Sequence, residues 1–162
     1  MKTLASASAS SHGTESQANE RWAVVTYLGG DGGRETHGYM YGVYSVKARM
    51  KALGMSPRVD QVVFYNHVTP KEYVEVLEGW LGPENVIFTN IENDLPVSFK
   101  EGAKSHELWV GVFAKLVFFN LTRYDRLITL DNDVLIRQNI EHWFWNYPPP
   151  CCYAFTRRDG ME

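Results

Sequence analysis

The sequence has almost no cysteine, and it has no apolar run long enough to cross a membrane. Its two cysteines, Cys151 and Cys152, are adjacent, and vicinal cysteines rarely bridge each other. A disulfide framework is therefore excluded, and we expect a reduced, cytoplasmic protein without a membrane span. A dense stripe of Lys and Arg is also missing, because 16 basic residues face 19 acidic ones and the net charge is −3. This balance argues against a nucleic-acid partner.

The first twenty residues lack the apolar stretch of a secretory signal. They are rich in Ser and Ala, and their small apolar surface cannot offset the entropy that is lost on ordering. We therefore predict a disordered tail over residues 1–20. The remainder, 21–162, is long enough to form one domain with its own core.

Short apolar runs alternate with longer amphipathic segments along this domain. Strands are predicted where apolar and β-branched residues cluster, over 22–28, 59–65, 85–89, 127–130 and 152–156. Helices are predicted where apolar residues recur at steps of three and four, over 39–53, 70–81, 105–121 and 140–145. The run Thr69-Pro70-Lys71-Glu72 has the form of a capping box that starts the second helix. This alternation indicates an α/β fold with a mostly parallel sheet.

Two aspartates directly follow one of the predicted strands. The run 127–130 is almost entirely apolar, which predicts a strand buried on both faces of a parallel sheet. Asp131 and Asp133 come next, at the end where open α/β sheets bind ligands. The two carboxylates either share one face of an extended strand or approach one ion across a turn at Asn132. Their oxygens suit Mn²⁺ or Mg²⁺, which also bind phosphate. The alternative is a solvated turn, because Asp and Asn favour turns.

Lys115 is the second candidate site residue. The helix predicted over 105–121 has an apolar stripe formed by Leu108, Val112, Leu116 and Phe119. Lys115 lies two helical turns after Leu108 and therefore falls in line with this stripe. A lysine there either reaches a phosphate or has a buried stem with its ammonium group in solvent. A glycine-rich loop over 29–33 is a weaker signal, because it matches neither a Walker loop nor a dinucleotide fingerprint.

Taken in order, these motifs resemble glycosyltransferase family 8, the group of glycogenin and galactinol synthase. The resemblance covers roughly residues 21–156. The run 23–28 is similar to the first strand of the family, and 38–47 is similar to the helix that follows it. The most specific part is an ordered set of segments: Phe113-Ala114-Lys115-Leu116, Tyr124, Leu130-Asp131-Asn132-Asp133 and Asn139-Ile140-Glu141-His142-Trp143-Phe144.

The resemblance implies a GT-A-type, Rossmann-like fold and transfer of a hexose from a UDP-sugar with retention of the anomeric configuration. It implies that Asp131 and Asp133 bind Mn²⁺ or Mg²⁺. The residues implied to contact the UDP-sugar donor are Thr26, Tyr27, Leu28, Lys115, Asp131, Asp133 and, through its backbone, Asn132. The expected acceptor is a sugar, a polyol or a protein, and a second copy of the chain in a homodimer is a further candidate partner.

The sequence departs from the family pattern in two places. The loop after the first strand carries Arg34 and Glu35 where the family has an aromatic residue that stacks on uracil. The chain also ends at Glu162, before further donor- and acceptor-contacting segments of the family, so we expect a truncated domain. An inactive domain that binds UDP and metal is therefore the alternative function. A haloacid-dehalogenase-type phosphatase and a sugar-phosphate nucleotidyltransferase are disfavoured, because their additional phosphate-binding motifs are missing.

Overall fold

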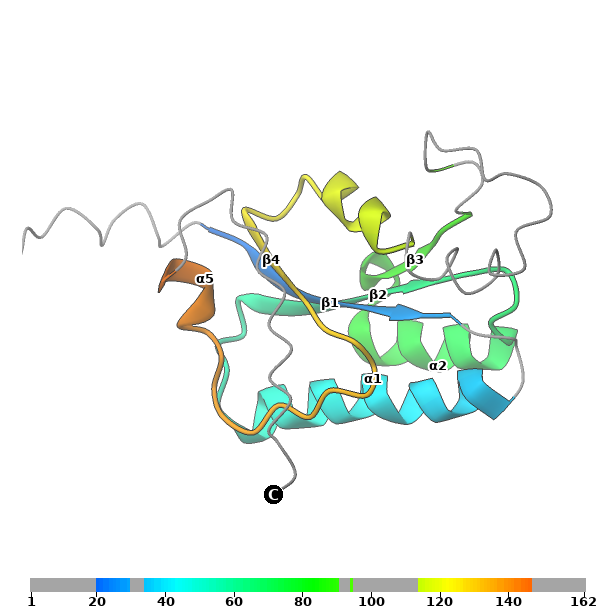
Figure 1. The fold of residues 1–162 in the computed structure, drawn as a ribbon, viewed down its shortest axis with the longest axis horizontal. Helices are drawn as coiled ribbons and strands as arrows, with labels where there is room; N and C mark the ends of the chain where they lie inside the picture. Colours follow the sequence, from blue (N-terminus) through cyan, green and yellow to red (C-terminus); the bar gives the residue numbers. More distant parts are fainter. Residues whose placement is uncertain (1–19, 30–33, 91–93, 95–113, 147–162) are drawn as a thin grey trace, which may run out of the picture.

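The computed structural model describes residues 20–29, 34–90, 94 and 114–146. Its centre is a sheet formed by β1 (Trp22–Leu28), β2 (Val59–Tyr65), β3 (Val86–Phe88) and β4 (Arg126–Thr129). All the pairings are parallel, and the order across the sheet is β3-β2-β1-β4. The predicted α/β class with a parallel sheet and flanking helices is therefore confirmed (Figure 1). We call the edge at which the strands begin the amino edge and the opposite edge the carboxyl edge.

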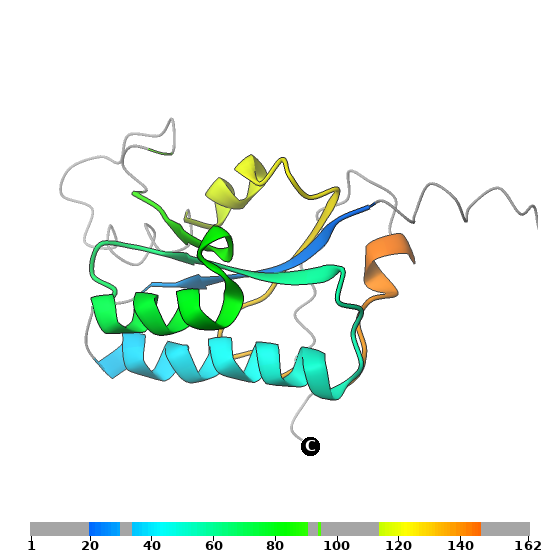
Figure 2. The ribbon, with the colours of Figure 1, turned by 180° about the vertical axis from the view of Figure 1, so that it is seen from behind.

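Two helices cover one face of the sheet. Helix α1 (Arg34–Ala52) connects β1 to β2, and α2 (Lys71–Leu81) with the short 3-10 helix η2 (Pro83–Asn85) connects β2 to β3. Figures 1 and 2 show both helices on the same side. Their apolar stripes pack against every second residue of the strands. This layer of the core contains Trp22, Val24, Leu28, Met40, Val43, Val46, Met50, Val59, Val63, Val74, Leu77 and Leu81.

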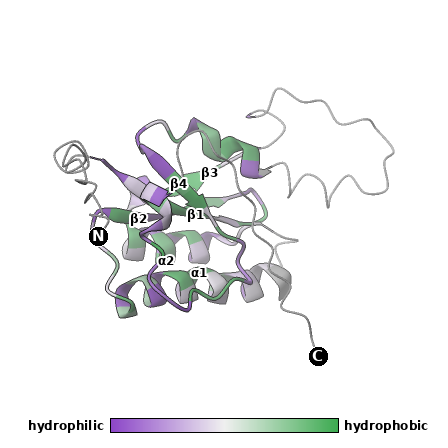
Figure 3. Ribbon diagram, turned by 60° about the vertical axis from the view of Figure 1, so that its left-hand side comes forward, coloured by the Kyte–Doolittle hydropathy of each residue, from purple (hydrophilic) through white to green (hydrophobic). Residues whose placement is uncertain are grey.

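The opposite face of the sheet carries the 3-10 helix η3 (Ala114–Asn120), which precedes β4. The intervening strand residues point to this side, because successive side chains of a strand face opposite ways. This second layer contains Ala23, Val25, Val62, Phe64, Val117, Phe118, Leu121 and Tyr124. The central strands are thus apolar on both faces, as the hydrophobic colouring in the middle of Figure 3 shows.

After β4 the chain runs along α1 to the short helix α5 (Trp143–Asn146), as Figure 1 shows. Ile136 and Ile140 are buried in the same layer as α1. The Arg49 Nε donates to the carbonyl oxygen of Ile136 at 2.8 Å. Phe144 stacks on Trp22 with ring centroids 5.2 Å apart. These contacts fix the path of the segment that carries the two aspartates.

The predicted strands agree closely with the structure, whereas several predictions about helices and one about burial are wrong in detail. Strands β1 and β2 have the predicted bounds, and β3 and β4 differ by one residue at their ends. Helix α1 begins at Arg34, before the predicted start at Tyr39. Pro70 occupies the cap position of α2 without a side-chain cap, and the Thr69 hydroxyl bonds elsewhere. Strand β4 is only half-buried, because β1 is its sole neighbour within the part of the sheet that the structure describes.

Several predictions lie outside the described residues. These are the tail up to residue 19, the glycines at 30–33, most of the loop over 90–104, the first part of the helix over 105–121, and the strand over 152–156 with both cysteines. Glu20, the last residue of the predicted tail, accepts a hydrogen bond from Trp22 Nε1 at 3.1 Å. Within the described ranges no helix is long and apolar enough to span a membrane.

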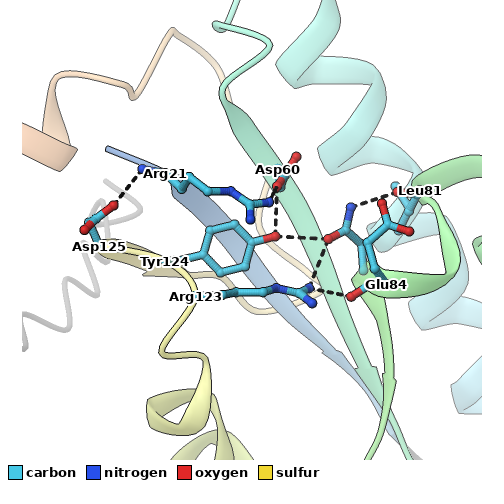
Figure 4. A network of polar contacts seen from close by, with 8 residues as sticks. Arg21, Asp60, Leu81, Glu84, Arg123, Tyr124 and Asp125 are labelled. Carbon is cyan, nitrogen blue, oxygen red and sulfur yellow. Dashed lines mark hydrogen bonds and ion pairs between the residues drawn. The ribbon is translucent and has the colours of Figure 1, made fainter. Parts of the chain in front are cut away.

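A polar network joins the strands at the amino edge (Figure 4). The Tyr124 hydroxyl, just before β4, lies 2.9 Å from Asp60 Oδ2 on β2 and 3.0 Å from Asn85 Oδ1 before β3. Arg21, before β1, pairs with the same Asp60 oxygen at 3.2 Å. Arg21 and Arg123 each lie 5.1 Å from the centre of the Tyr124 ring. The beginnings of all these strands are thereby tied to one buried tyrosine.

Candidate functional site

The strand order places a topological switch point at the carboxyl edge, between β1 and β4. From β1 the chain passes to β2 and β3 on one side of β1, and then returns to β4 on its other side. The connections also change face there, since α1 and α2 cover one face and η3 the other (Figure 2). Ligands of open α/β sheets bind at such a switch point, outside the carboxyl ends of the strands. The predicted site residues lie at this place.

Asp131 and Asp133 lie in a turn directly after β4. The Leu130 amide still bonds to the Val25 carbonyl of β1 at 2.9 Å, which continues the sheet by one residue. The chain then turns, and the Val134 amide donates to the Asp131 carbonyl at 3.2 Å. Both aspartates are exposed. Of the two geometries that the sequence allowed, the structure therefore has the turn and not the extended strand.

Lys115 forms an ion pair with Asp131 across the gap between η3 and the turn. The prediction that Leu116 and Phe119 form a buried apolar stripe is wrong, because both are exposed. The buried residues of this segment are Val117 and Phe118. The reason is the 3-10 geometry, whose three residues per turn present a different face from that of an α-helix. Lys115 is therefore on the side of the carboxylates, with its side chain 42% exposed.

Asn132 points inward between its two exposed neighbours. Its Nδ2 donates to the Tyr27 carbonyl at the end of β1, at 2.6 Å. Its Oδ1 is buried and has no hydrogen-bond partner among the described atoms. The Asn132 backbone also lies against α1, where a methyl group at Gly42 would meet its carbonyl oxygen at 1.8 Å. The middle residue of the motif is thus packed into the domain.

The end of β1 offers less side-chain surface to a ligand than the resemblance implies. Thr26 and Leu28 are completely buried, so that neither presents its side chain to a ligand. Tyr27 is partly exposed and points to the η3 side. Its ring fills the space that a side chain at Gly29 would need. Tyr27 is therefore the member of this predicted group whose side chain can contact a ligand.

Asn66 and Thr69, which lie at the end of β1 beside Tyr27, were not predicted as site residues. Burial raises the pKa of the Tyr27 hydroxyl, and a hydrogen bond from the Asn66 side chain lowers it again in part. The Thr69 hydroxyl lies 3.1 Å from Asn66 Oδ1 and 3.1 Å from the Leu28 carbonyl. Asn66 directly follows the apolar run of β2, as Asp131 follows β4, so the same rule about strand ends identifies it.

The donor set of the turn fits a hard divalent cation with open coordination positions. Among the described residues no three of His, Cys, Asp and Glu lie close enough together to bind a metal ion. Asp131 and Asp133 provide carboxylate oxygens, the atoms that Mg²⁺ and Mn²⁺ prefer. Asp131 already holds the cationic group of Lys115. Because Mg²⁺-like ions are bound by one or two carboxylates plus phosphate oxygens, such a pair suffices when a diphosphate is present.

The segment Asn139 to Phe144, which contributes to the family resemblance, has a structural role here. Asn139 Oδ1 accepts from the Glu141 amide at 2.8 Å. Glu141 Oε1 accepts from the Ser56 amide at 2.6 Å, which ties the segment to the end of α1. Phe144 packs on Trp22 at the amino edge. The motif therefore anchors the chain after the turn and lies away from the aspartates.

No protein-family model matches the chain. It is 36% identical over 62 residues to "Glucose N-acetyltransferase 1" of Gibberella zeae, which is 38% of this chain and 13% of that protein. To the protein of the same name from Aspergillus fumigatus it is 38% identical over 66 residues, 39% of this chain and 17% of that protein. A protein of Acanthamoeba polyphaga mimivirus, R707, is 30% identical over 89 residues, 55% and 24% of the two chains. The chain thus spans at most 24% of the length of these relatives.

Proposed function

We propose that this chain forms the nucleotide-sugar site of a metal-dependent glycosyltransferase similar to family 8. The observation that carries the proposal is the turn after β4, which presents two carboxylates beside the end of β1 at the switch point of a parallel sheet. The names of the relatives support transfer to or from a sugar. The proposed donor is a UDP-sugar, the proposed metal Mn²⁺ or Mg²⁺, and the proposed outcome retention of configuration.

In this proposal Asp131 and Asp133 would hold the metal ion. When bound beside a diphosphate, the metal would supply Lewis-acid stabilisation of the negative charge on the leaving group. Lys115 lies beside Asp131, so its ammonium group adds positive charge on the η3 side of the same site. The Tyr27 ring and hydroxyl border the site at the end of β1. The acceptor, a sugar, a polyol or a protein, enters from the open side of the turn.

The first experiment measures how much Mn²⁺ strengthens UDP binding, by calorimetry on residues 1–162. We expect Mn²⁺ to raise the affinity for UDP more than about tenfold, or by about 1.4 kcal/mol, because the diphosphate oxygens add ligands to the metal ion. The double variant Asp131→Asn, Asp133→Asn should lose this gain. The matched control is Glu72→Gln, Glu75→Gln, which removes two exposed carboxylates from α2. An unchanged gain in the aspartate variant would refute the assignment of the site.

A turnover assay distinguishes the proposed glycosyl transfer from two other candidate functions. The name glucose N-acetyltransferase of two relatives refers to acetyl transfer, so an acetyl donor is the second candidate substrate. A domain that binds UDP and metal without turnover is the third. Release of UDP from UDP-sugars with Mn²⁺ supports glycosyl transfer, whereas turnover of an acetyl thioester without UDP release supports acetyl transfer. Metal-dependent UDP binding with neither activity identifies the binding domain.

A further inference from the structure

Asn132 and Gly42 hold the turn between the two aspartates in place. We propose that they are positioning residues, which act through Asp131 and Asp133 and set how these carboxylates meet a metal-bound diphosphate. This inference rests on the proposed function. It gives the Asn132 side chain a role beyond the backbone contact that the resemblance implies, and it gives Gly42 a role that neither the motif nor the relatives assign. Gly42 lies in the middle of α1, and Asn132 lies in the turn after β4. The two segments are far apart in the sequence and are in contact in the fold.

Gly42 is required for space and not for backbone conformation. A Cβ at this position would lie 1.8 Å from the Asn132 carbonyl oxygen and 2.7 Å from its carbonyl carbon. Both of these atoms belong to the backbone, so no rotamer change can relieve the clash, and the turn would have to move. Glycine inside a helix is destabilising relative to alanine. Its presence here is explained by the close approach of the turn.

Asn132 fixes the turn from the other side. Its Nδ2 donates to the Tyr27 carbonyl at 2.6 Å, so the amide group is anchored to the end of β1. The Asp131 carbonyl accepts from the Val134 amide, which closes the turn. With the middle residue held inward, its exposed neighbours are presented outward on either side of it. Metal ligands whose supporting groups are fixed bind more tightly, and losing such support costs roughly 10- to 100-fold in affinity.

The test compares two alanine substitutions one turn apart on the same helix. Gly42→Ala inserts a methyl group into the Asn132 backbone, whereas the matched control Gly38→Ala meets no atom within 4 Å. The readout is the factor by which Mn²⁺ strengthens UDP binding. We expect Gly38→Ala to keep this factor and Gly42→Ala to lose most of it, because losing such support costs roughly 10- to 100-fold in metal affinity. UDP affinity without metal should stay the same in both, which a general loss of structure would not allow.

A second variant and a second readout keep the inference testable if Gly42→Ala folds poorly. Asn132→Ala adds no atom toward α1 and removes only the bond to Tyr27, and it should lower the same factor. Amide exchange at Leu130 and Val134, both hydrogen-bonded, should accelerate in Gly42→Ala and not in Gly38→Ala. Unchanged exchange and an unchanged factor in both test variants would overturn the positioning role alone. If Mn²⁺ does not raise the affinity of the wild-type chain for UDP, the proposed function itself is overturned.

Discussion

The two edges of the sheet differ in whether their buried polar groups have hydrogen-bond partners. At the amino edge Tyr124, Asp60 and Asn85 satisfy one another, and two arginines cover the tyrosine ring (Figure 4). At the carboxyl edge Asn132 Oδ1 is buried without a hydrogen-bond partner among the described residues, as are Thr26 Oγ1 and Gln61 Oε1 on the central strands. The amino edge is therefore closed by its own side chains, and the carboxyl edge is not.

This difference suggests that the amino edge contributes to the stability of the fold and the carboxyl edge to the binding of a ligand. A buried polar group without a partner costs roughly 1–3 kcal/mol, so Asn132 Oδ1 lowers stability at the carboxyl edge. The carboxyl edge also has exposed carboxylates on a turn that depends on a glycine for its position. Substitutions at the amino edge should thus change the free energy of unfolding, and those at the carboxyl edge should change ligand affinity.

The largest effect on stability is expected for Tyr124→Phe. This change leaves Asp60 Oδ2 and Asn85 Oδ1 without the hydroxyl that lies 2.9 and 3.0 Å from them. We expect the free energy of unfolding in urea to fall by about 1–3 kcal/mol. The effect of Mn²⁺ on UDP affinity should not change. The control is Tyr41→Phe, whose ring is 64% exposed and whose loss of a hydroxyl should be neutral. Equal stability of the two variants would contradict the closed amino edge.

The same tyrosine predicts how stability depends on pH. Burial, and then the hydrogen bond and negative charge of Asp60, raise the pKa of Tyr124 from 10.0 to about 12. Below pH 10 the hydroxyl is protonated in the folded and unfolded chains, and its stabilising effect is fully present. Between pH 10 and about 12 only the unfolded chain ionises, so stability is lost as the pH rises. The stability difference between wild type and Tyr124→Phe should therefore shrink over this range. A constant difference would mean that the hydroxyl is not protected by the network.

The smallest effect on stability is expected for Lys115→Met at the carboxyl edge. The side chains of Lys115 and Asp131 are 42% and 58% exposed, and such exposed pairs contribute less than about 1 kcal/mol. The melting temperature should stay the same, whereas UDP affinity should fall. Affinity for Mn²⁺ alone should rise, because Asp131 loses a competing cation. Lys71→Met, an exposed lysine paired with Glu75, is the matched control. If UDP affinity does not fall, Lys115 contributes only its apolar stem.

The strands, and the edge of the sheet at which the candidate residues lie, were predictable because both depend on local pattern. The runs 22–28 and 59–65 are β-branched and apolar, and their bounds agree with β1 and β2. Asp131 follows an apolar run, and parallel topology puts the ends of such runs at one edge. The ion pair of Asp131 with Lys115 brings together two residues that were selected on separate grounds.

The remaining features depend on contacts between distant segments. The capping box at Thr69 fails because its hydroxyl bonds to Leu28 and Asn66 at the end of other strands. The face of η3 could not be predicted, because an α-helical period was applied to a 3-10 helix. The role of Gly42 is invisible in the sequence, since it is set by the backbone of Asn132 across the fold. The contacts of Thr69, the buried face of η3 and the role of Gly42 all depend on tertiary structure.

The pairing of β4 with β1 also determines when the site can exist during folding. Trp22 pairs with Val59 on β2, but with Arg126 on β4, so the second contact closes a loop roughly three times as long and costs about 1 kcal/mol more in chain entropy. The lower entropy cost favours pairing of β1 with β2 before β4 docks. The bond from Asn132 to Tyr27, between residues 105 positions apart, forms only after that docking. A ligand at the turn would therefore bind only chains in which β4 has docked, and its binding energy would stabilise that docked state.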